Sequence, residues 1–285
     1  MACGPGRGSL ACAAAMDSTH AQPQVCSANE IVARIAPHGD GVLTFDGDGT
    51  LWTGDVGEDV FTAALERGML LDVARPALAA VAARHGTDPA GDANRIAAAL
   101  YDGYRDGRVG ELAICDVMSW CYAGHRLDEL HRFASEVLRE RDLPGRRIDE
   151  VGAIIDWARA AGRPLFVVSA SPQFVVEQAS QIWGWSAAHV VASPAAVDSS
   201  GCLLPLLAAP TPYGPAKVSR ARARFGESAR WLAAFGDNGF DLEMLLAARV
   251  GVAVRPKPGL AGRLDGSNGI VHLASAAAVP RGTRD

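Results

Sequence analysis

The amino-acid sequence predicts an α/β protein with a three-layer, Rossmann-like core, in which helices cover both faces of a parallel sheet. Two observations indicate the sheet. Short apolar segments alternate with helical patterns, and residues 165–168 form a continuous apolar run that is typical of a strand buried on both faces. A third observation indicates a separate helical part, because residues 55–140 contain no convincing strand and carry Ala, Leu and Arg at helical spacing.

The expected elements follow one another along the chain. A lead-in helix at residues 29–36 precedes the first strand at residues 42–45. Five helices then follow, at residues 58–67, 75–84, 94–105, 112–123 and 127–141. The remaining expected elements are helices at residues 147–161, 173–183, 217–225 and 240–248, strands at residues 165–168, 189–192, 231–235, 250–254 and 270–273, and a hairpin with a loop within residues 193–215.

These elements divide the chain into two expected domains, a core of residues 29–54 and 145–280 and a helical cap of residues 55–144. Residues 1–28 are expected to be a disordered leader, and residues 281–285 a frayed tail. The leader is rich in Ala, Gly and Cys and loosely imitates a signal peptide, so export is the alternative to a cytoplasmic location. The six cysteines form no C-x-x-C pair, which favours free thiols in a reducing compartment.

Composition excludes some classes of partner. The chain of 285 residues is 49% hydrophobic and 21% charged, which is enough apolar material for a packed core. Its net charge of −5 argues against nucleic acid, and no stretch reaches the length needed to cross a membrane. We expect a monomer or homodimer that acts on a small molecule.

Polar side chains follow three of the expected strands. Asp46 and Asp48 come after the first strand, and Ser169 follows the apolar run at residues 165–168. Asp237 and Asp241 follow the strand at residues 231–235. Because parallel strands end at the same edge of a sheet, these groups are expected to converge. Two carboxylates that lie close together repel each other unless a cation separates them, so the pattern predicts a site for a divalent metal and a phosphate. The alternatives are an Asp-Gly turn for the aspartates and a helix cap for Ser169.

The order of these motifs resembles that of the haloacid-dehalogenase-like phosphohydrolases, in particular the phosphoserine-phosphatase-like branch with a helical cap. The carrying residues are Asp46-Gly47-Asp48-Gly49-Thr50 after an apolar strand, Ser169 at a strand end, an isolated lysine for which Lys217 is the candidate, and Gly236-Asp237 with Asp241. The match covers about residues 40–275.

The resemblance implies a role for each of these positions. Asp46 is expected to be the nucleophile that forms an aspartyl-phosphate, and Asp48 the general acid and base. Mg²⁺ is the expected cofactor, held by Asp46, Asp237 and the main-chain carbonyl of Asp48. The phosphate oxygens are assigned to Ser169, Lys217 and the backbone amides of Gly47 and Ala170, and supporting positions to Asp241, Thr50 and Asn238. Lys217 has rivals in Arg220, Arg222 and Arg224.

The cap is expected to select the substrate. Asp55 and Glu58 lie where the resembling branch places a carboxylate against a substrate amine. Tyr101, Tyr104, Trp120 and Tyr122 are candidates to face a cation, although packing roles are the alternative for each. The expected substrate is therefore a phosphorylated amino alcohol such as phosphoserine or phosphocholine. Two departures bear on phosphoserine, because Ala170-Ser171 stand where that branch has Gly-Gly, and Phe240 where it tends to have Asn.

Three other functions are weighed. A dehalogenase needs no second aspartate, so Asp48 argues against it. A phosphonatase would need a cap lysine, and residues 55–140 contain none. A binding or regulatory protein that kept the fold without turnover is the non-enzyme alternative, although both motif aspartates are present.

Overall fold

The computed structural model of the protein describes residues 23–264, 266 and 268–275. The first 22 residues of the predicted leader and the predicted tail, residues 281–285, lie outside this part of the chain. Within the described part, no helix is both long and apolar enough to cross a membrane.

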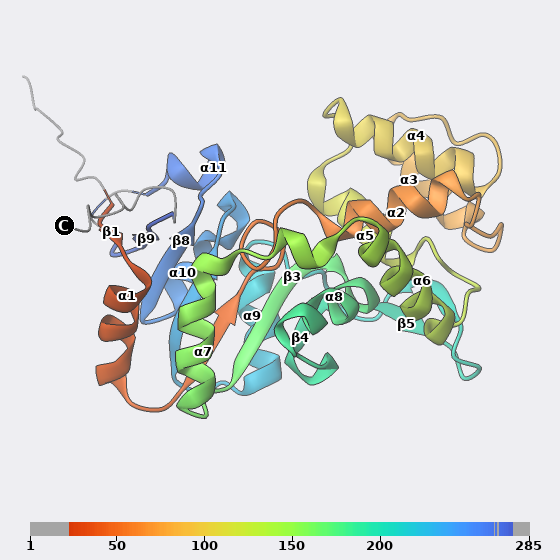
Figure 1. The fold of residues 1–285 in the computed structure, drawn as a ribbon. Helices are drawn as coiled ribbons and strands as arrows, with labels where there is room; N and C mark the ends of the chain where they lie inside the picture. The colour runs from red at the N-terminus through yellow and green to blue at the C-terminus, as the bar shows by residue number, and fades with distance from the viewer. Residues whose placement is uncertain (1–22, 265, 267, 276–285) are drawn as a thin grey trace, which may run out of the picture.

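A seven-stranded sheet forms the centre of the molecule (Figure 1). Its strand order is β1-β9-β8-β7-β2-β3-β4, and every neighbouring pair is parallel. The strands are β1 (Val25–Cys26), β2 (Val42–Phe45), β3 (Leu165–Pro172), β4 (Val190–Ser193), β7 (Trp231–Gly236), β8 (Val250–Val254) and β9 (Val271–Leu273). The predicted parallel α/β core is confirmed, and β2 lies between β7 and β3, so the ends of these three strands are adjacent.

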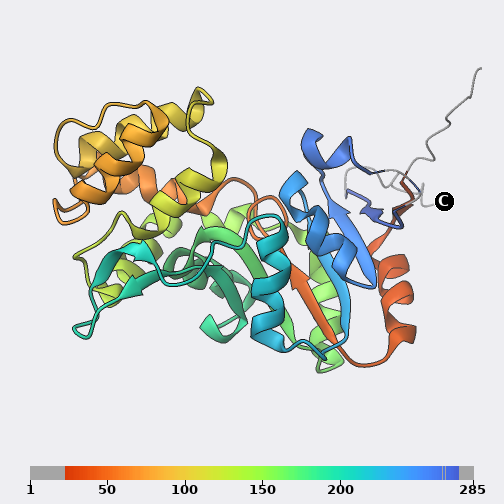
Figure 2. The same cartoon turned by 180° about the vertical axis from the view of Figure 1, so that it is seen from behind.

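Helices cover both faces of this sheet. On one face lie α1 (Ala28–Ile35), α7 (Gly152–Ala160) and α8 (Gln173–Ala179), and on the other α9 (Pro215–Phe225) and α10 (Leu242–Ala247), as Figures 1 and 2 show. The alternation of side chains along β2 matches this arrangement. Leu43 and Phe45 belong to the apolar cluster that includes Ile31 of α1, whereas Val42 packs in the cluster of Ala221 from α9. A short helix, α11 (Pro258–Ala261), follows β8.

The first strand corrects the predicted boundary of the leader. Val25 and Cys26 pair in parallel with His272 and Leu273 of β9, and Ser27 caps α1 with Glu30 in a reciprocal capping box. Ordered structure therefore begins before residue 28. A strand of two residues has no side-chain periodicity, which is why the sequence pattern did not reveal it.

Other differences concern the ends of elements. Residues 169–172, which we expected to follow the strand at residues 165–168, continue β3, because Pro172 pairs with Ser193 of β4. The expected helix at residues 147–161 is a 3₁₀ turn, Asp149–Val151, followed by α7. Similarly, a 3₁₀ turn at Gly239–Asp241 precedes α10, and another at Ser180–Trp183 follows α8.

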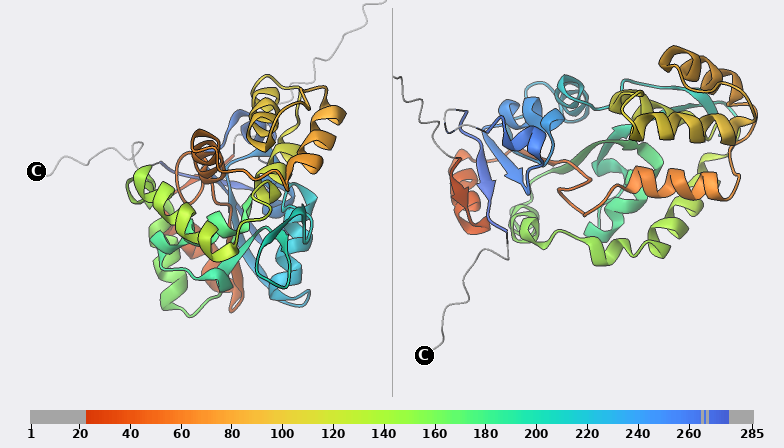
Figure 3. Two further views of the ribbon diagram at one scale, coloured as in Figure 1. Left: turned by 90° about the vertical axis from the view of Figure 1, so that its right-hand side faces the viewer. Right: turned by 90° about the horizontal axis from the view of Figure 1, so that it is seen from above.

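The inserted segment contains the five expected helices. They are α2 (Val56–Glu66), α3 (Arg75–His85), α4 (Ala93–Arg105), α5 (Glu111–Trp120) and α6 (Leu127–Glu140). The hairpin of β5 (Ala195–Val197) and β6 (Leu203–Leu207) lies beside them, as the view from above in Figure 3 shows. Backbone bonds join the two segments, because Gly124 N donates to Leu203 O at 2.8 Å and Leu203 N to His125 O at 2.9 Å. The cap is therefore accompanied by residues from much later in the chain.

Candidate metal and phosphate site

The loop after β2 folds tightly on itself at the edge of the sheet. Asp46 N donates to Phe235 O of β7 at 2.8 Å, and Leu51 N turns back to Gly47 O at 2.8 Å. Gly49 adopts a φ of +89°, and a Cβ atom there would overlap the carboxylate of Asp237. Glycine is therefore required at this position both for its backbone conformation and for the approach of Asp237.

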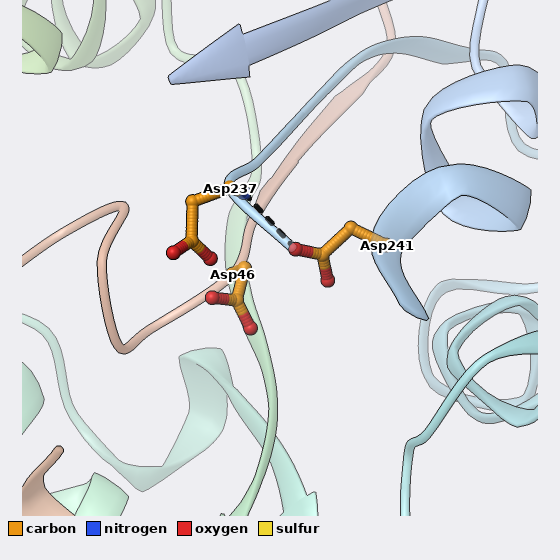
Figure 4. Close-up of side chains that lie close together, drawn as sticks. All are labelled: Asp46, Asp237 and Asp241. Carbon is orange, nitrogen blue, oxygen red and sulfur yellow. Dashed lines mark hydrogen bonds between the residues drawn. The ribbon is translucent and has the colours of Figure 1, made fainter. Parts of the chain in front are cut away.

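Three aspartates meet beyond the ends of β2 and β7 (Figure 4). One carboxylate oxygen from each of Asp46, Asp237 and Asp241 lies within 4.8 Å of those of the others, and all three residues are buried. The backbone fixes Asp241, whose Oδ2 accepts from Asp237 N at 3.0 Å and from Asn238 N at 2.9 Å. The predicted convergence of these strand ends is thus present in the structure.

A buried lysine lies against two of these carboxylates. Lys217 Nζ is 2.5 Å from Asp46 Oδ1 and 2.5 Å from Asp241 Oδ1, and the lysine is fully enclosed. Burial alone lowers the pKa of Lys217, but the charges of Asp241 and Asp46 outweigh it and raise the pKa above its ordinary value. Conversely, burial and the charge of Asp241 raise the pKa of Asp46, although Lys217 opposes them. The ammonium is therefore held charged beside Asp46.

The three arginines that were alternatives to Lys217 on the same helix form hydrogen bonds outside the aspartate cluster. Arg220 donates to Ala192 O at 3.4 Å, Arg222 to Ala229 O at 2.7 Å and Arg224 to Ala188 O at 2.5 Å. These partners are backbone carbonyls outside the aspartate cluster. Among the four basic residues of α9, Lys217 is the one that the structure places at the predicted site.

Asp237 has one satisfied and one unsatisfied oxygen. Its Oδ2 pairs with Lys257 Nζ at 3.0 Å, whereas its buried Oδ1 has no hydrogen-bond partner among the described residues. Burial raises the pKa of Asp237 to about 6, and Lys257 opposes this shift. A buried carboxylate oxygen without a donor is costly unless a cation approaches it, so the cluster fits a divalent metal. Lys257 is not among the residues predicted from the sequence, although its place just after β8 follows the same strand-end rule.

Asp48 has entirely different surroundings. Its Oδ1 accepts from Trp52 Nε1 at 2.7 Å and from Val56 N at 2.8 Å, and its Oδ2 accepts from Ser171 Oγ at 2.7 Å. The side chain is half-buried and lies outside the group formed by the other three carboxylates. Neutral donors rather than lysines hold it in place. The two aspartates of the motif are thus in chemically distinct positions.

Ser169 faces the loop after β2. A Cβ atom on Gly47 would lie 3.4 Å from Ser169 Oγ and 2.9 Å from the Trp52 ring, so Gly47 keeps this space open. Ser169 Oγ accepts from Ser171 N at 3.1 Å, and α8 has Pro172 rather than a serine at its cap. The alternative of a helix-capping role for Ser169 is therefore wrong. The neighbouring Ala170 is buried in the same strand.

The predicted supporting residues lie around this group. Thr50 is buried, and its hydroxyl has no partner among the described residues. Asn238 Oδ1 accepts from Gly239 N at 2.6 Å and so shapes the turn that carries Asp241.

The predicted cap residues separate into two sets. Asp55 caps α2 by accepting from Glu58 N at 2.8 Å, and Glu58 accepts from the Tyr101 hydroxyl at 3.1 Å. Asp55 retains solvent-exposed surface, yet its enclosure by neighbouring atoms and the charge of Asp48 raise its pKa. Trp120 and Tyr122, in contrast, are buried in the apolar core.

Two contacts that the sequence did not indicate join the cap to the core. The Tyr213 hydroxyl donates to Glu111 at 3.2 Å, and the Thr211 hydroxyl donates to Asp116 at 2.6 Å. Both carboxylates lie on α5, and both hydroxyls lie just before α9, which carries Lys217. No local sequence signal connects residues that are about a hundred positions apart.

Comparison with known proteins gave a family and a fold. A family model described as haloacid dehalogenase-like hydrolase matches residues 43–246. The structure is similar to a protein of unknown function from Bordetella pertussis Tohama I, with 20% identity, a TM-score of 0.63 and coverage of 82% of this chain and 98% of that one. A search of curated proteins found no match.

Two further solved structures share the fold. One is a HAD family hydrolase from Salmonella enterica serovar Typhi, with 14% identity, a TM-score of 0.52 and coverage of 82% of this chain and 67% of that one. The other is described as a probable phosphoserine phosphatase from Vibrio cholerae, with 13% identity, a TM-score of 0.52 and coverage of 83% of this chain and 62% of that one.

Proposed function

Because the chain belongs to the haloacid dehalogenase-like hydrolases, we propose that it is a Mg²⁺-dependent phosphomonoesterase that acts on a small phosphorylated metabolite through an aspartyl-phosphate. One observation carries this proposal. A buried carboxylate, Asp46, lies beside a buried ammonium and two further carboxylates, while Asp48 lies apart from them on neutral donors. An anionic nucleophile that attacks a phosphate dianion needs positive charge beside it, which Lys217 and a cation held by the carboxylates would supply.

Each step of the proposed reaction uses residues of this group. An oxygen of Asp46 attacks phosphorus, and the bond from phosphorus to the alcohol oxygen breaks. Asp48 gives its proton to the departing alkoxide and then takes a proton from the water that cleaves the aspartyl-phosphate. Lys217, Ser169 and the amides of Gly47 and Ala170 hold the phosphate oxygens. The products are the free alcohol and inorganic phosphate.

The donor set suits Mg²⁺. Asp46, Asp237 and the main-chain carbonyl of Asp48 would hold the ion, with Asp241 behind them. The unsatisfied oxygen of Asp237 supports this assignment. When bound, the ion would supply charge neutralisation between Asp46 and the phosphate oxygens.

The substrate that we propose is a phosphorylated amino alcohol such as phosphoserine or phosphocholine. Two kinds of support exist. The carboxylates of Asp55 and Glu58 lie near the start of the cap, and the Vibrio cholerae neighbour is described as a probable phosphoserine phosphatase. The chain spans 62% of that neighbour. We also propose that the protein is cytoplasmic and that it is a monomer or homodimer. Size-exclusion chromatography with light scattering would test the oligomeric state.

Hydrolysis of 4-nitrophenyl phosphate with and without Mg²⁺ tests the chemistry. We expect Mg²⁺-dependent release of phosphate from the wild type and a loss of more than about 10⁴-fold in kcat for Asp46→Asn. Asp40→Asn is the matched control, because Asp40 is exposed in the loop before β2. Turnover that survives Asp46→Asn or complete chelation would overturn the mechanism. Mg²⁺ binding without turnover on any phosphate ester would favour a regulatory protein instead.

A further inference from the structure

An aromatic pair lies next to the catalytic lysine. The Lys217 ammonium is 4.8 Å from the centre of the Phe240 ring, and the other ring of the pair, Tyr213, lies 4.7 Å from Phe240 at an angle of 31°. Both aromatic residues are half-buried, so part of each remains accessible. Phe240 stands where the resembling branch tends to have Asn, so this pair is a feature of this chain.

The cap holds the aromatic pair from the other side. Burial and the charge of Glu111 raise the pKa of Tyr213 to about 12, so its hydroxyl stays protonated and donates to Glu111. The Thr211–Asp116 bond fixes the same segment to the same cap helix, α5. The two rings therefore form a wall that runs from the Lys217 ammonium to the cap helix α5.

Lys217 lies on the core side of this wall, and the Glu111 carboxylate lies on its cap side. In the described part of the chain, no Lys or Arg forms an ion pair with Asp55, Glu58 or Glu111. Arg146 pairs instead with Asp59 at 2.5 Å, and the charge of Arg105 acts on Tyr101, which donates to Glu58. Burial and the charges of Glu58, Glu111 and Asp55 also raise the pKa of Tyr104.

We propose that the rings of Tyr213 and Phe240, together with the Glu111 carboxylate, select a phosphate ester whose leaving alcohol carries an ammonium group and no carboxylate. This inference rests on the proposed phosphatase function and narrows its substrate class. Aromatic faces and an unpaired carboxylate attract an ammonium group, most strongly when water is excluded. A carboxylate on the alcohol would need a basic partner, and the nearby Lys217 pairs with Asp46 and Asp241 and is assigned to the phosphate oxygens.

The test compares substrates whose leaving alcohols carry different charges. Phosphocholine and its neutral isostere, 3,3-dimethylbutyl phosphate, have nearly the same shape, and phosphoserine carries a primary ammonium together with a carboxylate. We expect kcat/KM for phosphocholine to exceed that for the isostere by about 10-fold, and phosphoserine to be the poorest of the three. 4-Nitrophenyl phosphate reports on the phosphatase reaction itself.

Variants locate the selectivity. Tyr213→Leu, Phe240→Leu and Glu111→Gln should each lower the preference for phosphocholine over the isostere by about 5-fold or more, mainly through KM. Tyr213→Phe keeps the ring and should retain most of the preference. Phe133→Leu is the matched control, because Phe133 is a cap residue whose ring contacts Arg67 rather than Lys217.

The outcomes separate the two proposals. If no phosphate ester is hydrolysed, the proposed function fails. If 4-nitrophenyl phosphate is hydrolysed but phosphocholine and the isostere react equally, or if phosphoserine is preferred, the phosphatase stands and the inference about the leaving group is wrong. The inference is also wrong if the ring variants lower both rates in the same proportion, because the wall would then only support Lys217.

Discussion

The carboxylates at the sheet edge are paired with lysines, whereas two carboxylates of the cap are bonded to tyrosines. At the sheet edge, Asp46 and Asp241 share Lys217, and Asp237 pairs with Lys257. In the cap, Glu58 and Glu111 accept hydrogen bonds from tyrosines but have no basic partner among the described residues. Two lysines thus offset part of the charge of the three carboxylates where phosphate and metal are expected, whereas the carboxylates are not ion-paired where the leaving group is expected. Tyr213 and Phe240 lie between these two regions, in contact with Glu111 on one side and Lys217 on the other.

Replacement of Lys217 should have the largest effect, and that effect is on the stability of the sheet edge. We expect Lys217→Met to lower the free energy of unfolding by about 3–5 kcal/mol, because it leaves Asp46 and Asp241 buried together without their cation. Urea unfolding without Mg²⁺ measures this loss, and Arg224→Met on the same helix is the control. Addition of Mg²⁺ should recover part of the stability. An unchanged midpoint would show that the carboxylates do not depend on the lysine.

Asp48→Asn tests the separation of the two motif aspartates. Because neutral donors hold Asp48, we expect the variant to fold and to bind Mg²⁺ like the wild type. Its kcat/KM, which reports on the step that releases the alcohol, should fall by about 10²–10⁴-fold for an alkyl phosphate and by clearly less for 4-nitrophenyl phosphate, whose leaving group needs little protonation. Parallel rate measurements on both esters supply the answer. Equal losses on the two esters would argue against a role as general acid.

The smallest effect is expected in the cap. Glu58→Gln keeps the bond to Tyr101 but removes one unpaired charge. We expect KM for an ammonium-bearing ester to rise by about 3-fold at low ionic strength and less at high salt, with kcat nearly unchanged. Initial rates at two salt concentrations measure this, with Glu66→Gln as a control at the exposed end of the same helix. A change in kcat instead would place Glu58 in the chemistry.

The sequence predicted most of the sheet because side-chain patterns report it directly. The bounds of β2 and β8 agree with the structure, and the strand-end rule placed Asp46, Asp237 and Asp241 near one another. Lys217, which lies on a helix, was suggested by the family resemblance. The two-residue strand β1 escaped prediction because backbone pairing with β9 forms it rather than a side-chain pattern. Lys257, Tyr213 and Glu111 escaped because their partners are distant in sequence and only the folded chain brings them together.

The hairpin beside the cap determines which residues must be transferred together in a chimera with a related protein. Its backbone hydrogen bonds with residues 124–127 join the hairpin to the inserted helices. The inserted helices are therefore held by a segment that follows β4 in the chain, as well as by the two chain connections to the core. A chimera that takes only residues 55–144 from a relative would lose these backbone hydrogen bonds and leave both segments without their partners. A functional graft must carry residues 195–207 as well, so the transferable module is discontinuous in the gene.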